Sequence, residues 1–431
     1  MVLNTKRLAV AGACALMGAL AAVPSADAAF TLADCGGSNI AGRGASFQAT
    51  AQSTWANGFK SYPVSLEPTA CPGSLTVSYD PAGSGAGRSA FGGGSTGGAR
   101  DASIRFIGYD EAPTATEQAQ IEAGTASTTD NGNLLTIPVT SAAITTVVNV
   151  PDSCTISGSP SNALIEQAFR GATTVDTWGE LYPAIAGSGS KTTAQCAATP
   201  ITRVVRLDSS GTTFQEKAFL DQVNPGDLDP STAGVQTWRS LPGESGQTEY
   251  GNTVWPNGST NLVRGTVNGA GSLADKLIAT DGGIGYLDLA TARSKSFAAT
   301  GDKRWLSLQD AGGTFRAPTV ASRGSNCAAT QQYNNVPANA EADWSQVYGA
   351  IPASGYPACA LTYVGIWDDY ADVYGNTAAE QANHRTVKDY VEFALSSTGQ
   401  ADAVSNDYGA LPSAIKTIAN NGVAQSTWNK P

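Results

Sequence analysis

Short apolar runs along the chain lead repeatedly into stretches with helical spacing. Residues 201–207 are rich in β-branched side chains, which predicts a short buried strand. Downstream, Phe214, Ala218, Phe219 and Val223 fall on one face of a helix. The pattern therefore predicts a strand, a tight turn and then an amphipathic helix.

The turn between this strand and helix is rich in hydroxyl side chains. Thr212 and Gln215 fit a capping box, so the helix is expected to begin between Ser210 and Thr212. The start of a helix presents unpaired N–H groups and the positive end of its dipole. Arg206 precedes the turn and supplies a planar cation that suits an oxyanion. We expect an anion-binding turn here, with an ordinary structural turn as the alternative.

Three other stretches share this design of strand, small or hydroxyl residues, and helix. Their turns contain Ser46 with Phe47, Ser84, and Asp110. For Asp110 the alternative is a structural role as the cap of a helix that follows Pro113. Strands that alternate with helices along the whole chain predict an α/β architecture.

A long β-rich run covers residues 134–150. The run is longer than a usual strand, so we expect Pro138 to divide it into two strands. Residues 295–370 are expected to be irregular. A chain of roughly 400 mature residues exceeds the usual size of one hydrophobic core and predicts two domains or one large domain.

Composition and charge exclude some classes of partner. Lys and Arg number 25 against 36 Asp and Glu, a net charge of −11. Such a chain repels nucleic acid and anionic membrane surfaces, so we expect neither as a partner.

The first 28 residues have the features of an export signal. Lys6 and Arg7 precede an apolar run over residues 8–23, and Ala26 and Ala28 form a cleavage pattern. We expect cleavage after Ala28 and a periplasmic, extracellular or cell-surface location. The alternatives are a retained membrane anchor and a lipoprotein acylated at Cys14.

Six cysteines follow the signal, and in an exported chain they predict disulfides. Pairing between neighbours is the simplest arrangement: Cys35–Cys71, Cys154–Cys196 and Cys327–Cys359. No metal site or other cofactor is expected, because there is no C-x-x-C motif and His384 is the only histidine. We interpret His384 as a solvated surface residue.

The order of the turns resembles the phosphate-binding proteins of bacterial phosphate ABC transporters, the PstS family. The resemblance rests on seven motifs over residues 40–292 and 386–420. These are Gly42–Phe47, Gly83–Gly85, Gly108–Pro113, Arg206–Phe214, Trp255–Gly258, Gly282–Tyr286 and Tyr408–Pro412.

The resemblance implies an α/β fold of the type 2 periplasmic-binding-protein class, with two lobes, a hinge of two chain crossings and the ligand between the lobes. It implies that eight residues contact phosphate, and that Asp208 orients Arg206 without contacting phosphate itself. The eight are Ser46, Phe47, Ser84, Asp110, Arg206, Ser210, Gly211 and Thr212.

The expected lobe boundaries follow from the two β-rich runs. One lobe comprises residues 29–138 with 288–431, and the other comprises residues 139–287. The chain departs from the family pattern at Tyr109–Glu111, at Ser209 where glycine is common, and over residues 295–385, interpreted as an addition.

The function implied is capture of phosphate by a monomer that delivers it to a membrane permease, without catalysis. Three alternative functions are a binding protein for sulfate or molybdate, a secreted phosphatase-like hydrolase, and a structural or adhesion protein. The hydrolase is disfavoured, because it would need a metal cluster or a histidine beside a nucleophile.

Overall fold

A computed structural model describes residues 36–64, 70–93, 98–123, 132–228, 236–239, 253–257, 261–320, 324–327 and 330–429. The expected export signal and Cys35 lie outside these ranges. Within them, no helix combines the length and apolar character needed to cross a membrane.

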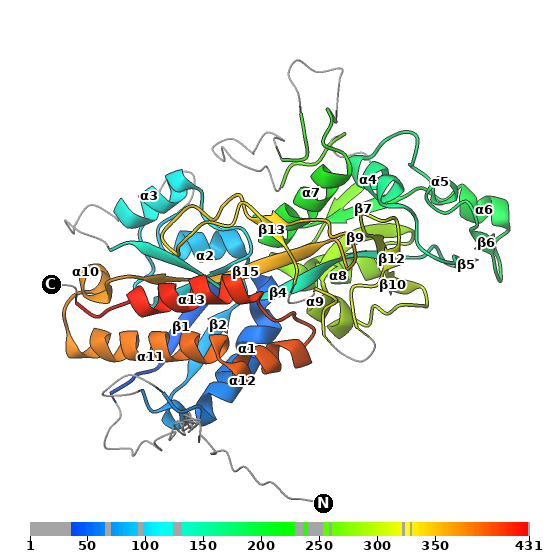
Figure 1. The fold of residues 1–431 in the computed structure, drawn as a ribbon. Helices are drawn as coiled ribbons and strands as arrows, with labels where there is room; N and C mark the ends of the chain where they lie inside the picture. Colours follow the sequence, from blue (N-terminus) through cyan, green and yellow to red (C-terminus); the bar gives the residue numbers. More distant parts are fainter. Residues whose placement is uncertain are drawn as a thin grey trace, which may run out of the picture.

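One nine-stranded sheet runs through the molecule (Figure 1), with strand order β2-β1-β3-β15-β4-β9-β7-β8 and with β10 also paired to β4. Strands β2, β1 and β3 are parallel to one another, as are β9, β7 and β8. Between these two groups lie β15 and β4, which pair antiparallel with each other and with their outer neighbours. The strands are β1 Ile40–Gly44, β2 Val77–Asp80, β3 Ile104–Tyr109, β4 Leu134–Asn149, β7 Thr202–Val205, β8 Leu262–Arg264, β9 Gly283–Asp288, β10 Lys303–Trp305 and β15 Cys359–Trp367.

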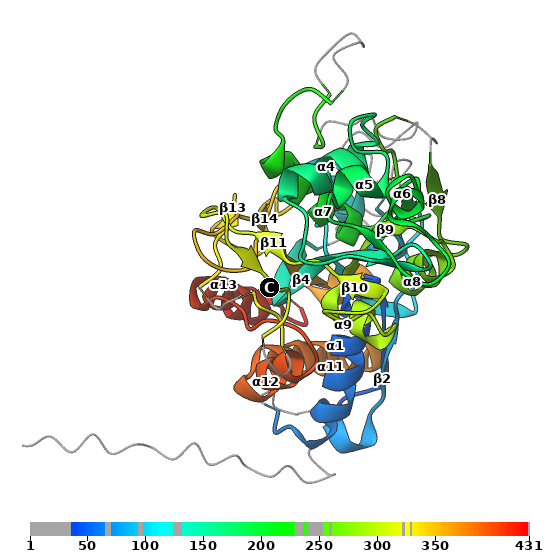
Figure 2. The ribbon, with the colours of Figure 1, turned by 90° about the vertical axis from the view of Figure 1, so that its right-hand side faces the viewer.

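The helices gather in two groups at the two ends of the sheet, and Figures 1 and 2 show α4–α6 at the opposite end from α1, α11 and α12. The predicted α/β class is confirmed. The first group is α1 Ala49–Gly58, α2 Ser84–Ala90, α3 Ala115–Ala123, α10 Tyr370–Tyr374, α11 Ala378–Leu395, α12 Ser397–Ser405 and α13 Ser413–Gln425. The second group is α4 Asn162–Arg170, α5 Trp178–Leu181, α6 Thr193–Ala197, α7 Gly211–Val223, α8 Ala270–Ile278 and α9 Leu289–Ser294.

Strand β4 belongs to both halves of the sheet. It is a single strand of 16 residues, so the prediction that Pro138 divides it was wrong. Nine of its first ten residues pair with β15, all but Val139, and residues 144–149 pair with β9. The ladder to β15 shifts register between Thr362 and Tyr363, beside Pro138. A proline has no N–H to donate, and this irregularity accommodates it without ending the strand.

Strand β15 was missed by the prediction of irregular structure over residues 295–370. All nine of its residues are buried, at the centre of the sheet. Elsewhere in that segment, β10 pairs with β4 and two short pairs form, β11 Leu308–Gln309 with β12 Phe315–Arg316 and β13 Tyr333–Asn334 with β14 Tyr348–Gly349. Periodicity does not identify a strand that is buried on both faces, because its apolar residues do not alternate with polar ones.

Two of the predicted disulfides are confirmed. Cys154 and Cys196 join the short strand β5, Cys154–Thr155, to α6, and Cys327 joins Cys359 at the start of β15. Cys71 is also disulfide-bonded. Because Cys35 lies outside the described residues, the pairing Cys35–Cys71 stays a prediction.

Candidate functional site

The four predicted turns converge on one place. Each follows the carboxyl end of a strand: β1 leads to Ser46, β2 to Ser84, β3 to Asp110 and β7 to Arg206. The backbones at the ends of β1 and β3 lie close together, and this close approach requires glycine at position 44. The φ of Gly44 is +150°, and an added Cβ would lie 1.9 Å from the carbonyl oxygen of Gly108. Binding sites at the carboxyl ends of strands are typical of open α/β sheets.

Helix α7 begins at the centre of this cluster. The Ser210 hydroxyl caps it by accepting a hydrogen bond from the Thr213 N–H at 3.3 Å. The predicted start is therefore correct, but the capping box of Thr212 and Gln215 is wrong, because Gln215 instead donates to the carbonyl of Asp110 at 2.9 Å. Residue Gly211 cannot carry a side chain, since a Cβ would lie 2.6 Å from the Ser84 hydroxyl oxygen.

Asp110 is the acceptor group of the cluster and is 1% exposed. The Thr362 hydroxyl donates to its Oδ1 at 2.7 Å. The hydroxyls of Ser84 and Thr212 each lie 3.5 Å from its Oδ2, and its own N–H donates to Ser84 Oγ at 3.1 Å. Burial raises the pKa of Asp110 to about 7, against the opposing effects of Thr362 and Arg206. Near neutral pH this carboxyl group can therefore either accept or donate a hydrogen bond.

The alternative role of Asp110 as a helix cap does not fit the structure. Thr114 makes the capping contact of α3, accepting a hydrogen bond from the Glu117 N–H at 3.1 Å. The Glu117 carboxylate accepts from the Thr114 N–H at 3.3 Å in return. Asp110 lies four residues before Thr114 and is directed at the hydroxyl cluster instead.

Arg206 is 2% exposed and its guanidinium plane is fixed by Asp208. Nε donates to Asp208 Oδ1 at 2.8 Å, and Nη2 pairs with Oδ2. The backbone N–H of Arg206 donates to the Tyr286 hydroxyl at 3.2 Å, and its carbonyl accepts from Arg264 at 2.9 Å. Two-point pairing of this kind holds a cation in one orientation. Asp208 is the residue that fixes the orientation of Arg206 in this structure, and its place beside a bound ligand stays a prediction.

Ser46 and Phe47 lie at the side of the cluster. The Ser46 hydroxyl accepts a hydrogen bond from the Ala270 N–H at 3.1 Å, at the start of α8. Phe47 is fully buried and its carbonyl accepts from the Tyr408 hydroxyl at 2.6 Å. Since Gly269 N–H also donates to Asp208 at 3.2 Å, the start of α8 is part of the cluster.

Sequence reasoning missed several groups here. Thr362 and the start of α8 gave no local signal, because they reach the cluster only through the fold. Arg88 was also missed: it is buried, paired with Glu111 and Glu117 at 3.3 Å each, and donates to the Ser209 hydroxyl at 3.4 Å. Arg206 is therefore not the only buried cation beside the turn.

His384 was expected at the surface, but it is 4% exposed within α11. Its ring lies 5.1 Å from that of Tyr370, and Nε2 lies 3.3 Å from the Ser426 hydroxyl. Burial lowers the pKa of His384 to about 4, so the ring is neutral at physiological pH. Within the described ranges, no three His, Cys, Asp or Glu side chains are grouped as a metal ion would require.

Comparisons with known proteins identify the fold. The profile of the family described as PBP superfamily domain matches residues 36–398. A phosphate-binding protein from Stenotrophomonas maltophilia has a similar structure, at 20% identity and a TM-score of 0.59, over 88% of this chain and 92% of that one. No curated protein matches the sequence.

Two further structures are similar. The high-affinity periplasmic phosphate-binding protein PfluDING, bound with phosphate, aligns at 22% identity and a TM-score of 0.57 over 91% of this chain and 99% of that one. A human phosphate-binding apolipoprotein aligns at 19% identity and a TM-score of 0.57 over 89% and 93%. At these identities the likeness shows the fold, which is the mixed α/β, two-lobed type expected.

Proposed function

Because this chain belongs to the PBP superfamily, we propose that it is an exported solute-binding protein that captures inorganic phosphate between its two lobes. The observation that carries the proposal is the convergence of one buried carboxyl group, Asp110, with hydroxyls, the start of α7 and an oriented arginine. The similar structures named above are described as phosphate-binding proteins, which supports the same ligand.

The donor groups of the cluster suit a tetrahedral oxyanion. Hydroxyls of Ser46, Ser84 and Thr212, N–H groups at the start of α7, and the guanidinium of Arg206 would surround the anion. Such groups meet its charge locally, so the acidic net charge of the protein does not oppose binding. We propose the eight residues implied by the resemblance as the ligand set, with Phe47, Ser210 and Gly211 taking part through their backbone or as helix-start groups.

Asp110 would select phosphate over sulfate. Phosphate near neutral pH carries at least one O–H and can donate it to a carboxylate, whereas sulfate carries none. Sulfate would therefore face ionised Asp110 as a like charge without a hydrogen bond. The same pocket without an acceptor would hold both anions equally.

Membership of the same family also supports proposals for the cellular role of this protein and for the extent of its lobes. The two disulfides and the superfamily fit an exported protein, and we propose that the signal is cleaved after Ala28 and that a membrane permease of an ABC transporter receives the phosphate. The protein would act as a monomer and without catalysis. Its lobes would comprise residues 29–138 with 288–431 and residues 139–287, joined by a hinge.

Calorimetric titration of the dialysed protein tests the function. Phosphate should bind with one site per chain at pH 7, and sulfate and molybdate should bind more weakly. Release of phosphate from a phosphomonoester should stay at the level of buffer. Equal or tighter binding of sulfate or molybdate, or hydrolysis that depends on the protein, would contradict the proposal.

A further inference from the structure

Asp110 is the end of a buried series of hydrogen bonds that leads away from the proposed site. We call it the glutamine relay: Tyr390, Gln52, Gln48, Thr362 and Asp110. The Tyr390 hydroxyl donates to Gln52 Oε1 at 2.7 Å, and Gln52 Nε2 donates to Gln48 Oε1 at 2.8 Å. Gln48 Nε2 donates to Thr362 Oγ1 at 2.6 Å, and Thr362 donates to Asp110 Oδ1 at 2.7 Å. All five residues are buried.

The direction of every donor in the relay is determined by one backbone carbonyl. Gln48 also contacts the carbonyl oxygen of Tyr363 at 2.6 Å, and a carbonyl only accepts. The amide nitrogen of Gln48 must therefore face Tyr363, which leaves its oxygen to accept from Gln52. Gln52 must then place its nitrogen toward Gln48 and its oxygen toward the Tyr390 hydroxyl. Reversing either amide would bring two acceptors together.

The hydrogen bond that Thr362 accepts from Gln48 determines that the Thr362 hydroxyl donates toward Asp110. Its oxygen accepts from Gln48, so its single hydrogen goes to an acceptor, of which Asp110 Oδ1 at 2.7 Å is closer than the Tyr109 carbonyl at 3.3 Å. A hydroxyl that accepts a hydrogen bond is a stronger donor in turn. Oδ1 of Asp110 is thereby engaged, and Oδ2 is the oxygen that faces Ser84 and Thr212.

We propose that Gln48 and Thr362 are positioning residues for Asp110: their fixed donor directions keep Oδ1 as the acceptor of the Thr362 hydrogen bond and leave Oδ2 to accept a hydrogen bond from the O–H of the bound anion. This inference rests on the proposed function and adds the residues that give Asp110 its selectivity. Neither residue contacts the anion itself; they act through Asp110.

Other groups also act on Asp110. Asp288, at the start of α9, raises its pKa and Arg206 lowers it. The phenols of Tyr79, Tyr363 and Tyr408 also lie in its electrostatic surroundings. These five side chains keep their identity in the Gln48 and Thr362 variants, and the matched controls below separate their effects from the loss of the hydrogen bond.

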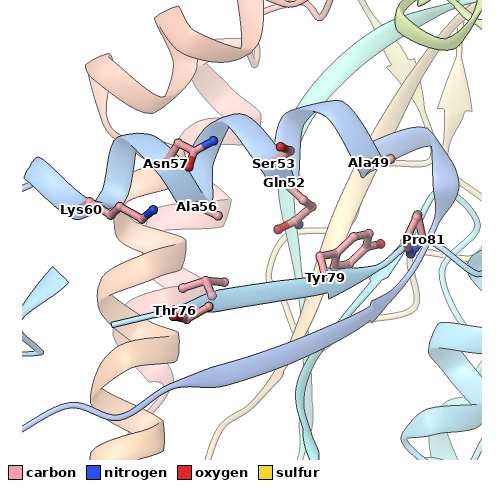
Figure 3. A pocket seen from close by; sticks show the side chains of 10 residues that line it. Ala49, Gln52, Ser53, Ala56, Asn57, Lys60, Thr76, Tyr79 and Pro81 are labelled. Carbon is pink, nitrogen blue, oxygen red and sulfur yellow. The ribbon is translucent and has the colours of Figure 1, made fainter. Parts of the chain in front are cut away.

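The far end of the relay reaches the outer face of the first helix group. Gln52 lines a surface pocket of about 350 Å³ between α1 and β2. Figure 3 shows its side chain beside Tyr79, between the helix and the strand, with Lys60 further along the helix. Gln52 is only 1% exposed although it lines this pocket, so the relay meets the pocket at one nearly buried side chain.

NMR titration of the free protein, labelled with ¹³C at aspartate carboxyl groups, tests the proposal. The Asp110 signal is identified by its loss in Asp110→Asn. Thr362→Val should raise the pKa of Asp110 by about one unit, because it removes a hydrogen bond to the charged form. Gln48→Met should also raise the pKa of Asp110, but by a smaller amount. The double variant should match Thr362→Val, since Gln48 acts only through Thr362.

Two controls separate positioning from packing. Gln400 is also buried and makes three hydrogen bonds, to Val139, Ala394 and Leu411, outside the relay. Gln400→Met should lower stability much as Gln48→Met does but leave the Asp110 titration unchanged. Thr362→Ser keeps the hydroxyl and should keep the wild-type pKa.

The outcomes are distinct. An Asp110 pKa in Gln48→Met equal to that of the wild type, or a further shift in the double variant beyond Thr362→Val, would overturn the relay. Calorimetry of the wild type with phosphate is run in parallel. If the wild type binds no phosphate, the proposed function fails, whereas the relay is decided by the titration of the free protein alone.

Discussion

Replacing Asp110 by Asn is the most direct test of selectivity, because Thr362 determines how the new amide lies. The Thr362 hydroxyl donates to the oxygen at the Oδ1 position, so the amide oxygen takes that place. The amide NH₂ then takes the place of Oδ2, beside the hydroxyls of Ser84 and Thr212. The amide NH₂ of the variant, a donor, thus faces the anion at the position that the acceptor Oδ2 has in the wild type.

The expected size follows from the groups exchanged. Both anions are relieved of the like charge of Asp110, which at about 4 Å and an effective dielectric constant of about 20 costs about 4 kcal/mol, so this effect largely cancels in their ratio. Phosphate alone loses a hydrogen bond to a charged acceptor, about 1.5–3 kcal/mol. The ratio of phosphate to sulfate affinity should therefore fall by about 10- to 150-fold.

The assay is calorimetric titration of wild type and Asp110→Asn with both anions between pH 6 and pH 8.5. Since the pKa of Asp110 is raised to about 7, the wild-type carboxyl becomes neutral as the pH falls and can donate. Sulfate binding to the wild type should strengthen toward pH 6, and this dependence should disappear in Asp110→Asn. A phosphate-to-sulfate ratio unchanged by the substitution would refute the reasoning and leave Asp110 a structural residue.

Three further predictions concern charge, stability and disulfides. Arg206→Ala should weaken phosphate and sulfate together by about 2–5 kcal/mol, measured by the same titrations, because it also leaves Asp208 buried without its cation; loss of one anion alone would contradict this. Glu216 is fully buried in α7, and burial raises its pKa to about 8 against the opposing effect of the Thr146 hydroxyl. The folded state then holds this proton more tightly than the unfolded state, so Glu216→Gln should gain melting stability over the wild type from about pH 5 to about pH 8, by up to about 1.4 kcal/mol per pH unit, and the difference should level off above that; a constant difference from pH 5 to pH 8 would show that Glu216 is ionised in the folded state throughout. Non-reducing peptide mapping should recover Cys35 linked to Cys71, and a peptide joining either one to Cys154 or Cys196 would refute the pairing.

The turns were predictable because their signals are local. A strand pattern, a glycine and a hydroxyl before an apolar helical face all lie within about ten residues of Ser84 or Ser210. Even there the cap was misassigned, since Thr212 and Ser210 are both acceptable caps and only packing chooses between them.

Other features depend on contacts between distant segments. The relay joins Gln48 to Thr362 and Tyr390, and no local pattern marks a glutamine as a donor to another strand. His384 is buried because Tyr370 and Trp428 cover it, although its neighbours in sequence are polar. Pro138 lies inside one strand because β4 carries an extra, unpaired residue beside it, Val139. These outcomes are set by tertiary packing, which overrides local propensity.

The place of β15 in the sheet also has a consequence for the order in which the molecule can assemble. Strands β3 and β4 both pair with β15, yet β5 to β14 come between β4 and β15 along the chain. While the polypeptide is synthesised, the facing edges of β3 and β4 therefore stay unpaired until residue 367 has emerged. Pairings of such long range close slowly. The final quarter of the sequence, which contains β15, is therefore the part that completes the core.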